Sequence, residues 1–464
     1  MLKILFLFLM ASGIPVAIAM AGSSLIYILV SGDMPGYAVV HRMIGGIDSF
    51  PLLAVPFFIL AGNLMNNAGI TNRIYNFALA LVGWLKGGLG HVNVVGSVIF
   101  AGMSGTAIAD AAGLGTIEIK AMKDHGYDLE FAVGVTAASA TLGPIIPPSL
   151  PFVIYAMMAN VSVGALFLAG ILPGVLMAFL MMLTVAYFAH KNGWGGDIRF
   201  EWPRVAKALI ETAVVIAWPL AVYGLINAGL QPQLTVLGSM VVLFAADRYF
   251  NFQAVLPIMT PVLLIGGMTT GLFTPTEGAI AACAWAMVLG LAWYRTLSWK
   301  MFVKVCLDTV ETTATVMFIV AAASIFGWML TATGVTSAIA SWVLGFTREP
   351  WIFLLLANVL MLFVGCFLEP TAAITILVPI LLPIARQLGI DPVHFGLVMV
   401  LNLMIGLLHP PMGMVLFVLA RVAKLSIERT TMAILPWLVP LLVSLIVLTY
   451  VPAIGLWLPR AMGM

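Results

Sequence analysis

Apolar residues run in long, nearly unbroken stretches along this chain and seldom alternate with polar ones. Stretches near or above the roughly 20 residues needed to cross a bilayer recur throughout, for example at residues 4–30, 154–189 and 435–456. We count about a dozen such segments by this length criterion. The pattern predicts an all-α polytopic membrane protein.

Composition supports this interpretation. Hydrophobic residues make up 62% of the 464 positions and charged residues only 8%, whereas a soluble domain carries roughly one-quarter charged residues. A water-soluble fold is excluded, and a formal net charge of +2 over this length gives no basic patch for nucleic acid. Cys283, Cys306 and Cys366 lie in apolar segments without C-x-x-C spacing, which favours reduced packing residues over disulfides or a metal site.

The sequence contains an internal repeat. Gly-Tyr-Asp at 126–128 matches Gly-Ile-Asp at 389–391, and Gly-x-x-x-Pro-Pro at 143–148 matches the same motif at 406–411, both at an offset of 263 residues. Upstream landmarks recur at an offset of 265: Gly62, Gly69 and Thr106 match Gly327, Gly334 and Thr371. The chain therefore reads as two copies of one unit, residues 1–200 and 255–464.

Charge predicts how the two copies are oriented. If the segments around Lys86, Lys120 and Lys191 are cytoplasmic, most of the 20 Lys and Arg residues fall on the cytoplasmic side, as the positive-inside rule requires. The first repeat then begins outside and the second inside, so the repeats are inverted. Inverted repeats are typical of secondary transporters.

Each repeat is predicted to contain a re-entrant hairpin. Segments 92–103 and 107–122 are short and rich in Gly and Ala, with Ser104-Gly105-Thr106 as the tip. The corresponding tip in the second repeat is Glu369-Pro370-Thr371, between segments 351–368 and 372–388. Glu369 is a functional candidate because a carboxylate is costly in an apolar segment.

Each repeat also contains a helix that its prolines interrupt, at 143–149 and at 406–413. Such unwound helices persist in membranes where the backbone lines protein or a water-filled cavity. The exposed carbonyl oxygens suit Na⁺, and the amide groups at the next helix N-terminus suit a carboxylate. We expect the hairpin tips to meet these breaks near the membrane midplane.

Other polar positions receive simpler predictions. Asp110 and Glu118 are expected to face the cytoplasmic vestibule. The mixed polar and aromatic stretches around Arg42, at 202–207 and at 299–304 are expected to form interfacial helices that brace a moving domain.

The chain resembles the DctM-type large permease subunit of tripartite ATP-independent periplasmic (TRAP) transporters. The stretches that carry the resemblance are 271–277, the tip at 104–107 with Asp110, the break at 143–149, and His-Pro-Pro at 409–411 with Gly413. The resemblance implies an elevator-type transporter of the bacterial inner membrane, driven by sodium, that imports organic acids. It also implies two partners, a small four-helix membrane subunit and a periplasmic substrate-binding protein.

The resemblance also implies site residues. One sodium site is expected at Ser104, Gly105, Thr106, Gly143 and Ile146, and the other at Glu369, Thr371, Gly406 and Met412. We expect Ser149 and His409 beside the carboxylate substrate. Sodium is the co-transported ion, and no catalytic residues or further metals are expected.

The inverted repeats, each with one hairpin and one broken helix, divide the chain into scaffold and transport segments. Residues 88–160 and 350–425 are expected to form the two halves of the transport domain, and the scaffold and arms are expected at 1–87, 161–349 and 426–464. Relative to the usual pattern, two extra helices are predicted at 210–228 and 233–250. Such a pair preserves the downstream topology.

Two alternatives remain open. An intramembrane serine protease would use Ser104, within Gly-Met-Ser-Gly, with His125 or His409 as base. A second repeat with Glu369 in place of Ser104 has no use in a protease, which argues against an enzyme. A stand-alone sodium/dicarboxylate symporter of related architecture would need no binding protein.

Overall fold

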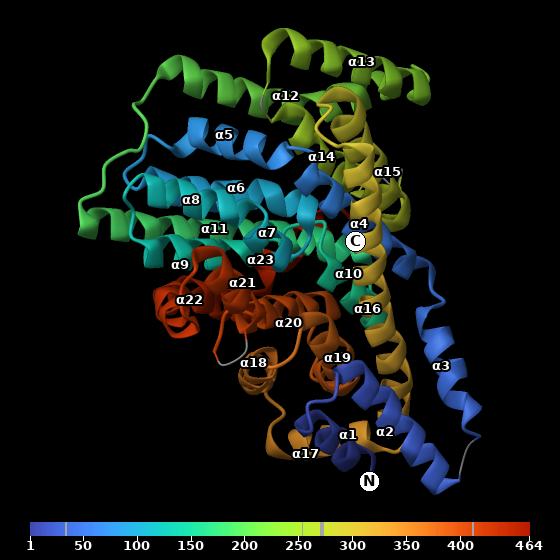
Figure 1. Cartoon of the computed structure of the whole chain (residues 1–464). Helices are drawn as coiled ribbons and strands as arrows, with labels where there is room; N and C mark the ends of the chain where they lie inside the picture. Colours follow the sequence, from blue (N-terminus) through green and yellow to red (C-terminus); the bar gives the residue numbers. More distant parts are fainter. Residues whose placement is uncertain (33–34, 253, 270–272, 411–412) are drawn as a thin grey trace.

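The computed structural model describes residues 1–32, 35–252, 254–269, 273–410 and 413–464, and this part of the chain is helical without strands (Figure 1). Six helices of the described part are long and apolar enough to cross a membrane. They are α11 (Val163–Asn192), α12 (Trp202–Asn227), α15 with its π-helical continuation (Pro275–Trp293), α16 (Trp299–Ala332), α19 (Pro370–Gln387) and α22 (Ile427–Tyr450). The predicted all-α membrane fold is confirmed.

The order of elements repeats along the chain. The first copy begins with α1 (Leu2–Ala11), α2 (Val16–Ser31), α3 (Tyr37–Ile47), α4 (Ala54–Asn67) and α5 (Ile70–Val82). The second begins with α14 (Val255–Thr269), α15 (Pro275–Met287), α16 and α17 (Val335–Phe346).

One long helix of the second copy corresponds to two helices of the first. The first copy carries Gly45 and Gly46 in the last turn of α3, and Pro51 in the 3₁₀ turn (Phe50–Leu53) that joins α3 to α4. Gly and Pro destabilise a helix interior, whereas α16 has neither before Gly327. Residues 202–207 and 299–304, where interfacial helices are expected, form the first turns of α12 and α16.

Both predicted hairpins are present. Hairpin 1 consists of α6 (Gly88–Ser104), α7 (Ala107–Ala112) and α8 (Leu114–Asp124), and hairpin 2 of α18 (Pro350–Gly365) and α19. The second limb of hairpin 1 was expected as one segment, 107–122, but it divides at Gly113. A Cβ there would lie 2.8 Å from the backbone carbonyl oxygen of Ala109 in α7, so glycine is favoured at this division between α7 and α8.

Both predicted breaks are present as well. Break 1 (residues 141–149) joins α9 (Leu129–Ala140) to α10 (Leu150–Ala159), and break 2 (residues 407–413) joins α20 (Pro392–Gly406) to α21 (Met414–Ala423). The described extra pair is α12 and α13 (Pro232–Phe250).

The two hairpins enter the bundle from opposite ends. α9 starts beside the base of hairpin 1, and Arg386 at the base of hairpin 2 donates to the carbonyl of Ala159, where α10 ends. α20 starts beside hairpin 2, and Arg429, in the helix that follows α21, pairs with Glu130 of α9 at 2.7 Å. The broken helices are therefore antiparallel.

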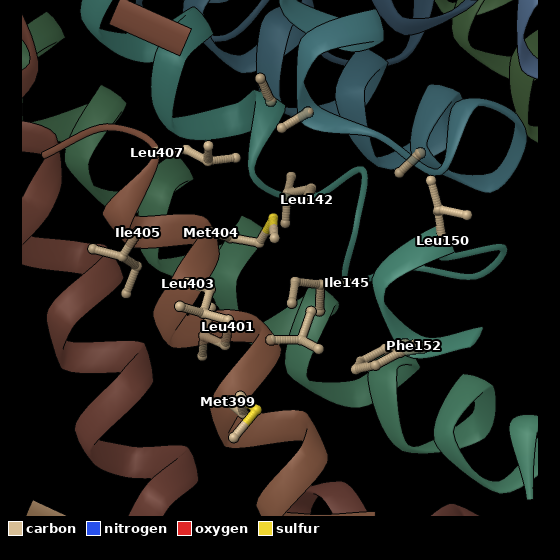
Figure 2. Packing of buried hydrophobic residues seen from close by; sticks show 14 of the residues in the cluster. Leu142, Ile145, Leu150, Phe152, Met399, Leu401, Leu403, Met404, Ile405 and Leu407 are labelled. Atoms are coloured by element: carbon tan, nitrogen blue, oxygen red, sulfur yellow. The ribbon is translucent and has the colours of Figure 1, made fainter. Parts of the chain in front are cut away.

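The core lies where these antiparallel elements cross. Figure 2 shows Leu142 and Ile145, from break 1, beside Leu403 and Met404 of α20, and all four side chains are buried in one cluster. Burial of such side chains contributes about 1.5–3 kcal/mol each in water, but lipid is as apolar as the core, so close packing has the larger role here.

Candidate functional site

A cavity of about 650 Å³ is lined by the hairpin tips together with α4, α5 and α16. Ser104 and Thr106 line it from the tip of hairpin 1, and Glu369 lines it from the tip of hairpin 2. The two tips, 265 residues apart in sequence, therefore face one shared space.

The tip of hairpin 1 packs backbone against backbone on break 1. Gly105 has a φ of +63°, and a Cβ there would lie 2.6 Å from the Pro148 carbonyl oxygen. A Cβ on Gly143 would lie 3.1 Å from the Thr106 carbonyl oxygen, while the Thr106 hydroxyl accepts from the Ala109 amide at 3.3 Å. The tip residues and Gly143 of the first predicted sodium site thus lie together.

Two other predicted residues of this region point elsewhere. Ile146 directs its side chain at Gly174 of α11, away from the tip. Ser149, fully buried, donates its hydroxyl hydrogen to the Pro144 carbonyl and accepts from the Phe152 amide at 3.3 Å, so it closes break 1 and caps α10. The Ser149 side chain is absent from the described lining of the cavity.

In the second repeat, the end of α18 before the tip packs backbone against backbone on the end of α20 before break 2. A Cβ on Gly406 would lie 2.7 Å from Cα of Gly365, where α18 ends. Glu369 caps α19: it accepts the Thr371 hydroxyl at 2.8 Å and the Ala372 amide at 3.2 Å.

The remaining predicted residues of break 2 are less informative. Met412 lies outside the described residues, as do the first two residues of the 271–277 motif. His409 is exposed, and its Nδ1 lies 2.7 Å from the Pro410 carbonyl oxygen and 3.2 Å from Sγ of Cys366. It borders the tip of hairpin 2 but is not in the described lining of the cavity.

Four asparagines that the sequence interpretation overlooked form much of the facing wall. Asn63, Asn66, Asn67 and Asn72 lie at the end of α4 and the start of α5. Asn63 donates to the Thr309 hydroxyl at 3.0 Å, which fixes α4 against α16. The signal was available, because four asparagines within ten residues are unusual inside a membrane-spanning region.

One sequence-based expectation is wrong in this region, and one alternative finds no support. Asp110 and Glu118 do not face a vestibule, since each is only 1% exposed. The protease geometry is also missing, because no hydrogen bond joins Ser104 to an imidazole among the described residues. His125 is at the far end of α8, where its Nδ1 lies 2.8 Å from the Ala121 carbonyl oxygen.

Comparisons with known proteins agree with this architecture. The family model "Tripartite ATP-independent periplasmic transporter, DctM component" matches residues 3–454. The chain is 40% identical over 453 residues to the sialic acid TRAP transporter large permease protein SiaM of Vibrio cholerae, covering 97% of this chain and 96% of that protein. It is 33% identical over 471 residues to the C4-dicarboxylate TRAP transporter large permease protein DctM of Rhodobacter capsulatus, covering 98% and 97%.

A solved structure shares the fold. The YdaH transporter of Alcanivorax borkumensis superimposes with a TM-score of 0.58 at 15% identity, covering 91% of this chain and 88% of that one. The relatives are permeases and not enzymes, which agrees with the prediction of a transport protein. Because the family model and the relatives match the chain almost from end to end, the chain belongs to the DctM component family of tripartite ATP-independent periplasmic transporters.

Proposed function

We propose that this chain is the membrane subunit that carries an organic acid across the bacterial inner membrane, and that a sodium gradient drives this transport. The observation that carries the proposal is the shared cavity, in which the tips of two oppositely inserted hairpins face one space. A site bounded by both tips is exposed to one side or the other when the hairpins move as a body.

Sodium coupling is supported by the chemistry of the tips. Glu369 is a carboxylate in the cavity, and no Lys, Arg or His lies among the described lining residues. A partly buried carboxylate without a basic partner favours a bound cation. Backbone carbonyls at the two breaks supply hard oxygen ligands, which suit Na⁺ and leave amide groups for the substrate.

The substrate class is inferred from the wall of asparagines. Amide side chains donate and accept hydrogen bonds, so Asn63, Asn66, Asn67 and Asn72 suit a hydroxyl-rich acid better than a purely apolar one. The named substrates of relatives include sialic acid, C4-dicarboxylates and 2,3-diketo-L-gulonate. We propose a hydroxylated carboxylic acid, such as a sugar acid, as the cargo.

The mechanism we propose is an elevator motion of the hairpins and broken helices across a scaffold. The boundaries at 88–160 and 350–425 stay a prediction. The packing of the helices favours one change to these boundaries. α22 packs along α9, and α11 packs on α22, α6 and α20. We therefore assign α11 and α22 to the moving group and leave α2, α3, α4 and α16, which pack together, as the scaffold.

Two partners complete the proposed system, a small four-helix membrane subunit and a periplasmic substrate-binding protein. α12 is mostly unburied within the chain and exposes Ile216, Leu220 and Tyr223. Such a surface suits either lipid or the small subunit, and the proposed transport path does not depend on which one covers it.

Uptake into vesicles tests the proposal. The chain is reconstituted with its small subunit, the binding protein is added outside, and a panel of sugar acids and C4-dicarboxylates is offered with and without an inward sodium gradient. We expect uptake of a hydroxylated acid that requires both sodium and the binding protein. Sodium-driven uptake of equal rate without the binding protein would instead support the stand-alone symporter.

A further inference from the structure

Hairpin 1 encloses a pair of carboxylates away from the cavity. Asp110 of α7 and Glu118 of α8 are each 1% exposed, and they are near enough for their charges to repel one another. Neither takes part in the ion pairs found among the described residues. Two buried like charges without a basic partner are unfavourable, so such a pair must either take up protons or hold a cation.

Unpartnered oxygens converge on this pair. Asp110 Oδ2 and both carboxylate oxygens of Glu118 are buried without a hydrogen-bond partner among the described residues. Ser97 of α6 is also 1% exposed, and its hydroxyl lies beside the Asp110 carboxyl group without a hydrogen bond to any other described residue. Glu118 reaches the same part of α6, because a Cβ on Gly96 would lie 3.0 Å from Glu118 Oε1.

The fold itself does not require these residues. At the repeat offset of 265, the positions of Asp110 and Glu118 correspond to Thr375 and Pro383 of hairpin 2. Hairpin 2 forms with a threonine whose hydroxyl bonds back to its own helix and with a proline. The acids are therefore an addition to one copy of the repeated unit.

We propose that Asp110, Glu118 and Ser97 bind a hard metal cation inside hairpin 1, at a site separate from the two tips. Four unpartnered side-chain oxygens, without nitrogen or sulfur donors, favour ions such as sodium or calcium over transition metals. The ion would fix α6, α7 and α8 to one another and keep the limbs of the hairpin rigid. Cation binding here does not depend on the proposed transport function.

Equilibrium binding to the purified full chain in lipid nanodiscs tests this site. Radiolabelled sodium and radiolabelled calcium are titrated separately into the wild type, Asp110→Asn, Glu118→Gln and the control Asp124→Asn, which alters an exposed carboxylate on the same helix. We expect both buried-acid variants to bind one fewer ion per chain for one of the two cations. Asp124→Asn should keep the wild-type stoichiometry.

Ser97→Ala serves as a second, milder variant in case the carboxylate variants fail to fold, because it keeps both carboxylates. It removes one of four oxygens, so the half-saturating ion concentration should rise about tenfold. The same ion should raise the melting temperature of the wild type by more than that of Glu118→Gln, which keeps only the sites outside hairpin 1. Unchanged stoichiometry and affinity in folded Glu118→Gln and Ser97→Ala would overturn the proposal for either cation.

The outcome of this binding experiment can be told apart from the outcome of the uptake experiment. Thr371→Ala, at the tip of hairpin 2, should leave the ion of hairpin 1 in place. If vesicles showed no sodium-coupled uptake, the binding lost in Glu118→Gln would still demonstrate the hairpin site.

Discussion

At the scale of single residues, glycines decide how closely each hairpin tip approaches its break. Gly365 and Gly406 bring the backbones of α18 and α20 into direct contact, and Gly105 and Gly143 do the same in the first repeat. Because backbone and not a flexible side chain is the neighbour, a methyl group cannot be accommodated by a rotamer change.

Gly406→Ala should therefore displace the tip of hairpin 2. Overpacking of this kind costs about 1–3 kcal/mol, so we expect a lower melting temperature and a large loss of uptake at unchanged expression. Gly224→Ala in α12 is the matched control, since a Cβ there meets nothing within 4 Å. Equal uptake by the two variants would show that the tight contact is irrelevant to transport.

Thr371 is the residue whose loss best tests the second sodium site. Thr371 is 1% exposed, and its hydroxyl donates a hydrogen bond to the Glu369 carboxylate at 2.8 Å. A hydrogen bond to a charged group contributes about 1.5–3 kcal/mol, so Thr371→Ala should raise the sodium concentration for half-maximal uptake by about tenfold or more. Glu369→Ala should have a larger effect in the same direction.

Thr375→Ala supplies the control for that titration. Its hydroxyl bonds to the Ala372 carbonyl within α19 and touches neither Glu369 nor the cavity. The assignment fails if Thr371→Ala and Glu369→Ala both retain the sodium dependence of Thr375→Ala.

At the scale of elements, a buried asparagine in the first limb of each hairpin is hydrogen-bonded to the broken helix of the same repeat. In the first repeat Asn93 of α6 accepts the Ser139 hydroxyl of α9 at 2.6 Å. In the second repeat Asn402 of α20 donates to Asn358 of α18 at 2.9 Å. Asn93 and Asn358 are equivalent at the repeat offset, so both copies use an asparagine to fix the first limb of the hairpin.

A double-mutant cycle measures this contact. We combine Asn358→Leu with Asn402→Leu and follow the free energy of unfolding in detergent. Hydrogen bonds between membrane helices contribute about 0.6–2 kcal/mol, so each single variant should be destabilised and the coupling energy should be about 1 kcal/mol. Simple additivity of the two single changes would mean that the asparagines do not interact.

At the scale of the whole molecule, the antiparallel broken helices give the two tips different access to water. Thr106 is partly exposed in the cavity, whereas Thr371 is buried. A rigid-body movement of the hairpins changes which tip is open without breaking the contacts of the tips with the breaks. Ligands shift such an equilibrium only by preferring one state.

Single cysteines at these positions test the motion, with the other cysteines replaced. In the conformation described here, Thr106→Cys should react readily with a small charged thiol reagent and Thr371→Cys slowly. Adding sodium and substrate should change the two rates in opposite directions. If both cysteines reacted at once from both sides of the membrane, the chain would be a channel and the alternating-access mechanism would be abandoned.

The sequence by itself determined the repeat, the helical membrane fold, both hairpins and both breaks. These features follow from local chemistry: apolar length sets a membrane helix, and Pro and Gly interrupt it wherever they occur. For the same reason the tips were placed within a few residues, at Ser104 to Thr106 and near Glu369.

Only the tertiary structure decided which side chains share a space, because that depends on contacts between segments far apart in the chain. Ser149 and Ile146 lie at suitable positions in the sequence. However, Ser149 bonds to the backbone of break 1 and Ile146 packs against α11, so their side chains point elsewhere. The asparagines of α4 and α5 reach the cavity only because hairpin 1 packs on them. Asp110 and Glu118 are buried for the same reason, since the three helices of hairpin 1 close around them, and helical periodicity alone does not specify that packing.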